Sequence, residues 1–454
     1  MSIIIATFIA LYHLKITIFK IINKIILAWH NFLSARVNIA KFIIITIAFS
    51  NKCNTFMKIV DKIILLDKDR REAKAKLDST LSESNRLAAE IGKMYKTGMR
   101  EEAEALKVKS TELKELSKEL SERFDSLQDQ INKLIIEMPN TPCDLVPEGK
   151  NADDNVVVRM EGEIPNLPED ALPHWELAKK YNIIDFELGN KVTGAGFPFY
   201  RGLGARLQRS LVTFFLNTAV EKGFTEYETP LVVNEASGFG TGQLPDKEGQ
   251  MYHCEIDNLY LIPTAEVPLT NIFRDVIVKE EDLPIKRVAY SACFRREAGS
   301  YGKDVRGLNR LHQFDKVEIV EISRQEDSYK ILDEMVEHVA SLIRALGLPF
   351  RIVRLCGGDI SFTSALTYDF EVFSAAQKRW LEVSSVSNFE SFQANRLHLR
   401  YRTADNKMVI AHTLNGSALA LPRIVAALLE DYQTPDGIRI PDVLVPYMGC
   451  NMIK

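Results

Sequence analysis

Apolar residues recur every three or four positions along two long segments in the first third of the chain. The repeat covers residues 73–95 and returns at residues 106–134, with Lys96-Thr-Gly98 between them. This spacing is typical of helices with one apolar face, and the glycine favours a tight turn. Two such helices hide their apolar faces by folding back on each other, so the sequence predicts an antiparallel coiled-coil hairpin. Pro139 ends the pattern because proline interrupts a helix.

A different pattern follows the hairpin. Residues 140–173 are rich in proline and aspartate, as in a linker, and His174 begins a second domain. A helix is predicted over residues 203–222. Apolar residues then alternate with polar ones along residues 288–294 and 314–320, on either side of a long polar loop. Such alternation is typical of strands, so this region is predicted to form a strand, a loop and a second strand.

The first 56 residues differ in composition from the rest of the chain. They are rich in Ile, Phe, Ala, Lys and Asn, and no acidic residue precedes Asp61. The longest uncharged apolar run, Ile3 to Leu14, is shorter than the ~20 residues that a membrane-spanning helix needs. Three interpretations remain open: a basic targeting or membrane-surface segment, a membrane anchor of imperfect helices, or an extension without selected structure. In the last case Met57 is a candidate start.

The overall composition is that of a globular protein with two or three domains. The chain has 454 residues, of which 46% are hydrophobic and 26% are charged. Its net charge of −4 argues against general nucleic-acid affinity, so any RNA contact must use local basic patches. Six cysteines are scattered without metal-ligand spacing and are interpreted as reduced thiols: Cys53, Cys143, Cys254, Cys293, Cys356 and Cys450.

The polar loop between the two predicted strands concentrates positive charge. Arg295 and Glu297 are two positions apart at the predicted strand end, so their side chains are expected to share one face of the sheet. A guanidinium group fixed on a strand suits a phosphate because its planar fork can bond two oxygens. A solvated hairpin tip is the alternative. The cations of this loop are Arg295, Arg296, Lys303, Arg306 and Arg310.

The run Phe294-Arg-Arg-Glu297, its loop and His312-Gln-Phe-Asp-Lys-Val-Glu318 resemble the second signature motif of class II aminoacyl-tRNA synthetases, in the form found in the seryl-tRNA synthetase family. The resemblance extends from about Lys58 to the end of the chain, and it is closest to the zinc-free bacterial type. Further stretches that carry it are residues 240–245, 261–271, 414–423 and 446–449.

The resemblance implies an α+β fold: an N-terminal antiparallel coiled-coil hairpin, then a class II catalytic domain built on an antiparallel β-sheet flanked by helices. It also implies a cytoplasmic homodimer that pairs through the helix and strand preceding Pro230. Organelle targeting or membrane tethering through the N-terminal segment is the alternative. The expected division is an extension (1–56), a tRNA-binding arm (57–139), a linker (140–173) and the catalytic domain (174–454).

For function, the resemblance implies a serine–tRNA ligase that activates L-serine with ATP and transfers it to the 3′ end of tRNA(Ser), and of tRNA(Sec) where the organism has it. The arm would grip the tRNA through phosphate contacts. Candidate contacts are Lys93, Lys96, Arg100, Lys107, Lys109, Lys114 and Lys118. The serine pocket would consist of Thr264, Ala265, Glu266, Glu318 and Ser417.

ATP would be held by arginines and by Mg²⁺, with no zinc expected. Arg295 would clamp the α-phosphate and the serine carboxylate, and Arg423 would bind the γ-phosphate end; these two are the predicted catalytic residues. Glu382 and Ser385 would hold Mg²⁺ through oxygen atoms. The predicted ATP-binding residues are Arg295, Arg296, Glu297 beside the adenine, Phe314 stacked on it, Glu382, Val383, Ser384, Ser385 and Arg423.

Three other functions are compatible with parts of the sequence. A synthetase-derived tethering protein without aminoacylation would have decayed motifs, whereas all three motifs are intact. An adenylating enzyme that serves a carrier protein would not need the long hairpin. Ligases for threonine or proline share parts of the motifs, but His312 to Glu318 and the hairpin favour serine.

Overall fold

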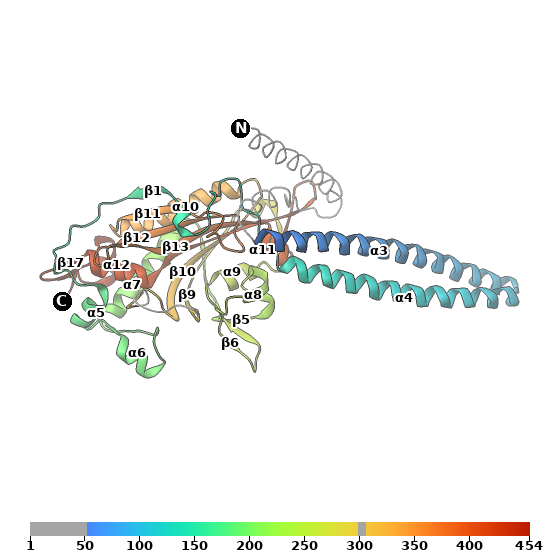
Figure 1. Cartoon of the computed structure of the whole chain (residues 1–454), viewed down its shortest axis with the longest axis horizontal. Helices are drawn as coiled ribbons and strands as arrows, with labels where there is room; N and C mark the ends of the chain where they lie inside the picture. Colours follow the sequence, from blue (N-terminus) through green and yellow to red (C-terminus); the bar gives the residue numbers. More distant parts are fainter. Residues whose placement is uncertain (1–51, 298–305) are drawn as a thin grey trace, which may run out of the picture. The chain divides into compact units, whose positions relative to one another are not determined.

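The computed structural model describes residues 52–297 and 306–454 (Figure 1). The predicted extension lies almost entirely outside these residues, as does Lys303 of the polar loop. The chain divides into a helical unit that ends at Pro139 and a second unit that runs from Asn140 to Lys454. Within the described ranges, no helix is both long enough and apolar enough to cross a membrane.

The helical unit is an antiparallel hairpin of two long helices, α3 (Lys52–Thr97) and α4 (Arg100–Ile136). The helices lie side by side along their length (Figure 1). Gly98 makes the turn with φ of 80°, a backbone conformation that costs glycine little. Leu77 and Leu127 are among the buried residues of the shared apolar seam. The predicted coiled-coil hairpin is therefore confirmed, and the 37 residues of α4 span about 55 Å.

The second unit is built on an eight-stranded sheet with strand order β1-β11-β12-β13-β16-β10-β9-β4. All neighbours are antiparallel except the parallel edge pair β4 and β9. The predicted α+β fold with an antiparallel sheet is confirmed. The strands are β1 (Val156–Glu161), β4 (Thr225–Glu228), β9 (Ile285–Phe294), β10 (Gln313–Ser323), β11 (Phe350–Arg354), β12 (Leu366–Ser374), β13 (Arg379–Glu390) and β16 (His412–Ala420).

Both faces of this sheet are covered, and alternate residues of β10 face different apolar clusters. Val317 and Ile319 join the larger cluster, which also includes residues of the helices α7 (Leu203–Glu221), α10 (Ser328–Ala345) and α12 (Leu421–Asp431). Val320 and Ile322 join a smaller cluster with residues of α9 (Glu266–Asn271) and α11 (Phe392–Arg396). Glu318 shares the face of Val320 because side chains two apart on a strand point the same way.

The segment 140–173, expected as a linker, contributes β1 to one edge of the sheet. The remaining elements are short and frame the main sheet. They are η1 (Ala152–Asp154), α5 (His174–Lys180), β2 (Ile184–Asp185), α6 (Phe186–Val192), β3 (Phe199–Tyr200), β5 (Val232–Asn234), α8 (Glu235–Thr241), β6 (His253–Cys254), β7 (Leu259–Leu261), β8 (Ile277–Lys279), η2 (Glu280–Asp282), β14 (Arg400–Arg402), β15 (Met408–Ile410), β17 (Gln433–Thr434), β18 (Gly437–Arg439), η4 (Asp442–Leu444), α13 (Val445–Met448) and β19 (Met452–Ile453).

Candidate active site

The predicted serine-pocket residues converge on Glu318, a fully buried carboxylate in the middle of β10. Its Oε2 accepts a hydrogen bond from Thr264 Oγ1 at 2.9 Å, and its Oε1 accepts one from Asn415 Nδ2 at 2.7 Å. Lys316 Nζ lies 2.5 Å from Oε2, because residues 316 and 318 share a face of the strand. Ser417 is directly opposite Glu318 on β16, so their side chains are neighbours.

A second buried carboxylate, Glu266, lies near the first. It begins α9, and its Oε1 accepts a hydrogen bond from Gln393 Nε2 at 2.7 Å. Burial and, to a lesser degree, the negative charge of Glu318 raise the pKa of Glu266 to about 7. A bound ammonium group would favour the charged form of Glu266. Ala265 is also buried here, but its methyl group packs in the smaller apolar cluster. We call Glu318, Glu266, Thr264 and Ser417 the carboxylate half of the site.

The predicted phosphate-binding arginines lie at the end of β9. The backbone N–H of Arg295 donates to His312 O at 2.9 Å, and its guanidinium carbon lies 5.3 Å from the centre of the Phe314 ring. The guanidinium of Arg296 lies 5.6 Å from the ring centre of Tyr252. Both arginines are therefore stacked against aromatic rings of neighbouring segments.

The expectation that Arg295 and Glu297 share one face of a strand is wrong. β9 ends at Phe294, and Glu297 has a left-handed backbone with φ of 48°. Period-two alternation therefore does not apply to these residues. Glu297 Oε2 instead accepts a hydrogen bond from Arg310 Nη1 at 2.9 Å, across the loop. The loop thus ties one of its own cations to a carboxylate and leaves Arg295 beside Phe314.

Arg423, near the start of α12, reaches two segments. Its Nε donates to Asn309 O at 3.1 Å, and its Nη1 donates to Glu382 O at 2.5 Å. Burial lowers the pKa of Arg423; the positive charges of Arg310 and Arg295 also lower it, and Glu382 opposes them. Arg423 is thus repelled by two neighbouring guanidinium groups, and a polyanion would compensate such a cluster of positive charge. We call Arg295, Arg310 and Arg423 the arginine half of the site.

A bulge in β13 brings Glu382 and Ser385 onto the same side. Glu371 of β12 faces Glu382, whereas Phe370 faces Ser384, so Val383 is an extra residue in the ladder. Side chains three apart on a regular strand point to opposite faces, yet Ser385 Oγ donates to Glu382 Oε1 at 3.3 Å. Val383 joins the larger apolar cluster, and Ser384 Oγ donates to the carbonyl of a β16 residue. Of these four predicted positions, two can offer side-chain oxygens to a ligand.

The oxygen atoms around the bulge fit a hard divalent cation. Asp369 of β12 pairs with Ser385, and its Oδ1 is buried with no hydrogen-bond partner among the described residues. Burial raises the pKa of Asp369, as does the charge of Glu382. A cation beside Glu382, Ser385 and Asp369 would give Asp369 Oδ1 a partner. All three side chains offer oxygen atoms, the ligand type that Mg²⁺ prefers. Within the ranges that the structure describes, three or more His, Cys, Asp or Glu side chains are nowhere grouped so as to hold a metal.

Arg295 joins the two halves. Its charge lowers the pKa of the Glu266 carboxyl and also that of the Arg423 guanidinium, so it lies within electrostatic range of both. Arg295 thus links Glu266, a predicted serine-binding residue, with Arg423, a predicted ATP-binding residue. The residues of this site that sequence reasoning missed include Asp369, Lys316, Asn415 and Gln393. Lys316 could have been found from its spacing to Glu318 and Asn415 from its place before Ser417, but no local pattern marks Gln393.

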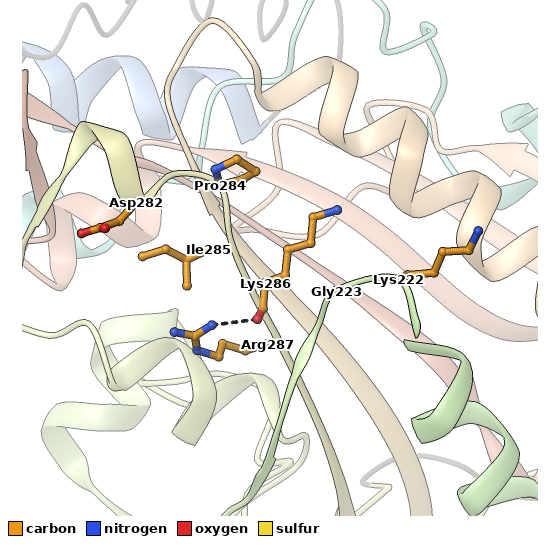
Figure 2. A pocket seen from close by; sticks show the side chains of 7 residues that line it. All are labelled: Lys222, Gly223, Asp282, Pro284, Ile285, Lys286 and Arg287. Carbon is orange, nitrogen blue, oxygen red and sulfur yellow. Dashed lines mark hydrogen bonds between the residues drawn. The ribbon is translucent and has the colours of Figure 1, made fainter. Parts of the chain in front are cut away.

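A separate pocket of about 560 Å³ lies at the end of the sheet where β4 meets β9 (Figure 2). Its lining includes three cations, but none of the predicted site residues. Arg287 Nη1 donates to Lys286 O at 2.9 Å (Figure 2), and Lys286 Nζ lies 3.7 Å from Glu321 Oε1. Two of the three cations therefore already have partners within the protein, and this pocket contains none of the predicted substrate-binding residues.

Two family models match this chain. The class II tRNA synthetase core domain (G, H, P, S and T) matches residues 252–432, and the seryl-tRNA synthetase N-terminal domain matches residues 48–142. The fold is thus that of a class II aminoacyl-tRNA synthetase.

Individual relatives narrow this class. The serine–tRNA ligase of Salinibacter ruber is 52% identical over 393 residues, which cover 86% of this chain and 92% of the relative. That of Akkermansia muciniphila is 46% identical over 399 residues, covering 87% and 93%. The chain belongs to the seryl-tRNA synthetase family.

Solved structures give the same result. The seryl-tRNA synthetase of Pyrococcus horikoshii, complexed with ATP, has a TM-score of 0.85 and 33% identity, covering 91% of this chain and 96% of that one. The cytoplasmic serine–tRNA ligase of Naegleria fowleri, in complex with AMP, has a TM-score of 0.78 and 27% identity, covering 87% and 92%. The family suggested by the sequence motifs is confirmed.

Proposed function

We propose that the carboxylate and arginine halves together form the site in which this chain activates serine. As a family member, the protein is an ATP-dependent serine–tRNA ligase whose substrates are serine, ATP and tRNA(Ser). The observation that carries the proposal is that Arg295, stacked on Phe314, acts by its charge on the buried carboxyl of Glu266 and on the guanidinium of Arg423. Its neighbours on one side suit an amino acid, and those on the other suit a triphosphate.

The carboxylate half would recognise serine. Its ammonium group would lie between Glu266 and Glu318, and its hydroxyl group would meet Glu318, Thr264 and Ser417. Alanine lacks the hydroxyl and would leave buried polar groups of the pocket unpaired, which costs about 1–3 kcal/mol for each group. The pocket can therefore reject alanine strongly. The backbone around Ala265 would line the same pocket.

The arginine half would bring the two anionic reactants together. Arg295 would contact the serine carboxylate and the α-phosphate, and Arg423 the γ-phosphate end. A serine carboxylate oxygen would bond to the α-phosphorus while the bond from that phosphorus to the bridging oxygen breaks, releasing pyrophosphate. No proton transfer is needed. Phe314 would stack on the adenine and Glu297 would contact it, with Arg296, Val383 and Ser384 completing the ATP site.

Glu382 and Ser385 would hold Mg²⁺, with Asp369 beside them. Mg²⁺ would neutralise phosphate charge and keep the triphosphate in one orientation. The chain's own contribution is to place the oxygen ligands on a rigid strand, since the bulge at Val383 brings both side chains to one side.

In the second step, a terminal hydroxyl of the tRNA would attack the seryl carbonyl and displace AMP. The arm would hold the tRNA by its phosphates. Lys107 and Lys109 already pair with Glu104 and Glu83 at 2.6 and 2.9 Å, which leaves Lys93, Lys96, Arg100, Lys114 and Lys118 as the better candidates. We further propose a cytoplasmic homodimer, paired through α7 and β4, that also serves tRNA(Sec) where it exists.

Serine-dependent exchange of pyrophosphate into ATP tests this proposal. Arg295→Ala and Arg423→Ala should each abolish exchange, whereas Arg402→Ala, which removes an exposed arginine of β14, should leave it unchanged. Undiminished exchange in both site variants would contradict the assigned roles. Charging of total tRNA with each amino acid then tests the second step, and transfer to a protein instead of tRNA would contradict it.

A further inference from the structure

The imidazole of His174, at the start of α5, is fully buried between the loop that follows β9 and helix α12. Its Nε2 accepts a hydrogen bond from the backbone N–H of Leu308 at 2.9 Å, and its Nδ1 lies 2.8 Å from Glu430 Oε1. A ring nitrogen that accepts a hydrogen bond carries no proton, so the proton of neutral His174 is on Nδ1 and is donated to Glu430. One side chain therefore ties together two segments that are far apart in the sequence.

These two segments also meet at Arg423. Asn309 follows Leu308, and its carbonyl accepts a hydrogen bond from Arg423 Nε at 3.1 Å. Arg423 and Glu430 are seven residues apart on α12, which is close to two helical turns, so they share one face of the helix. The contacts thus form a closed ring from His174 through the loop to Arg423, along α12 to Glu430, and back to His174.

This closed set of contacts leaves the side chains of His174 and Glu430 little freedom to move. Glu430 also accepts hydrogen bonds from the backbone N–H groups of His174 at 3.1 Å and Ala376 at 3.3 Å. Burial raises the pKa of Glu430, but the hydrogen bonds and charge of this environment outweigh burial, and the net direction is downward. A Cβ atom at Gly307 would collide with His174 Nε2, so the loop backbone lies directly against the imidazole. Both nitrogens of His174 are matched by buried partners.

We propose that His174 is a positioning residue for ATP, which fixes the carbonyl of Asn309 where Arg423 needs its acceptor. It acts through Arg423 and does not touch the substrate. Without the bond to Leu308, the loop carbonyl can move, and Arg423 loses an acceptor within a cluster of like charges. The contacts of Glu318 and Glu266 do not pass through this closed set of contacts, so these two carboxylates keep their positions without it. This inference rests on the proposed role of Arg423 at the triphosphate.

Two substitutions separate the two bonds of the imidazole. In His174→Asn, the amide N–H can still donate to Glu430, but the side chain is too short to accept from Leu308. In His174→Gln, the longer side chain can place its oxygen near the position of Nε2 and accept that bond. We expect His174→Asn to raise the KM for ATP in pyrophosphate exchange, and the Kd for ATP measured by calorimetry, by about ten- to a hundredfold. The KM for serine should stay within about twofold, and His174→Gln should restore most of the ATP affinity.

His338→Asn is the matched control. His338 is a buried histidine of α10 that stacks on Phe224, and neither ring nitrogen has a hydrogen-bond partner among the described residues. The His338→Asn substitution should lower the melting temperature without changing the KM for ATP or the KM for serine. Wild-type ATP affinity in His174→Asn would overturn the proposal, as would equal losses for ATP and serine that track melting temperature. If His174→Asn does not fold, ATP affinity is compared between His174→Gln and Arg423→Ala, and ATP binding by His174→Gln that is no tighter would overturn the proposal. No serine-dependent exchange by the wild-type protein would instead refute the proposed function, while calorimetry with ATP still tests His174.

Discussion

Replacing Glu266 by glutamine should stabilise the free enzyme at neutral pH and lower its affinity for serine. The pKa of Glu266 is raised from 4.5 to about 7 by burial and by the charge of Glu318. The folded protein therefore holds this proton more tightly than the unfolded chain does. As pH rises from 4.5 to 7, the buried carboxyl must ionise at increasing cost, and above about pH 7 the full cost is present.

The magnitude follows from the same pKa. At about 1.4 kcal/mol per pH unit, a rise from 4.5 to about 7 corresponds to about 3 kcal/mol of lost stability. Glutamine is neutral at every pH, and its side-chain oxygen can still accept the hydrogen bond from Gln393 Nε2. Relative to wild type, the variant should gain nothing below about pH 4.5 and up to about 3 kcal/mol above pH 7. For a domain of this size, that is a rise of roughly 5 °C in melting temperature.

The same substitution removes a charged partner of the serine ammonium group. A lost hydrogen bond to a charged group costs about 1.5–3 kcal/mol, so the KM for serine should rise by roughly ten- to a hundredfold while the KM for ATP changes little. Calorimetric melting between pH 4.5 and 8 measures the first effect, and pyrophosphate exchange measures the second. Saturating serine should narrow the difference in melting temperature because it binds wild type more tightly. A stability difference that does not vary with pH, or an unchanged KM for serine, would refute this reasoning.

Three further predictions address other parts of the molecule. Asn415→Ala should raise the KM for serine by about tenfold in pyrophosphate exchange because Glu318 loses the donor to its Oε1; an unchanged KM would argue against that orienting role. Glu382→Gln should raise the Mg²⁺ concentration needed for half-maximal exchange by about tenfold or more, and a Mg²⁺ titration matching wild type would exclude Glu382 as a ligand. Removing three cations at the tip of the arm should lower kcat/KM for tRNA charging and flatten its salt dependence, while exchange without tRNA stays at the wild-type level. The three substitutions are Lys93→Ala, Lys96→Ala and Arg100→Ala. If pyrophosphate exchange falls as much as tRNA charging does, the loss is not one of tRNA binding.

Local patterns predicted the elements of this fold better than they predicted its long-range pairing. The hairpin could be read from periodicity because its two helices are adjacent in sequence and its seam repeats many times. The place of β16 between β13 and β10 could not, since these strands are separated by long stretches of chain. No periodic signal records which distant strand becomes a neighbour. The antiparallel sheet was instead expected from the family resemblance.

The candidate site shows the same division. Glu318 and Arg423 lie in motifs that can be recognised in the sequence. The partners that orient such residues come from elsewhere: Gln393 fixes Glu266, and His174 holds the loop beside Arg423. Strand alternation also failed at Arg295 and Glu297, because the strand ends one residue earlier and the backbone turns.

The pKa directions across the site have a common physical origin. In the carboxylate half, burial raises the pKa of Glu266, and in the arginine half it lowers the pKa of Arg423. Both shifts disfavour the charged form, so burial opposes the charges that the two halves present to a ligand. An ammonium group in the first half and a triphosphate in the second would each reverse the local penalty. Serine also carries a negatively charged carboxylate, and ATP carries negatively charged phosphates, so each substrate by itself brings negative charge beside Arg295. The charge of Arg295 acts on both Glu266 and Arg423, so occupation of one half can change the electrostatics of the other through it, and a neutral residue at 295 should weaken that coupling.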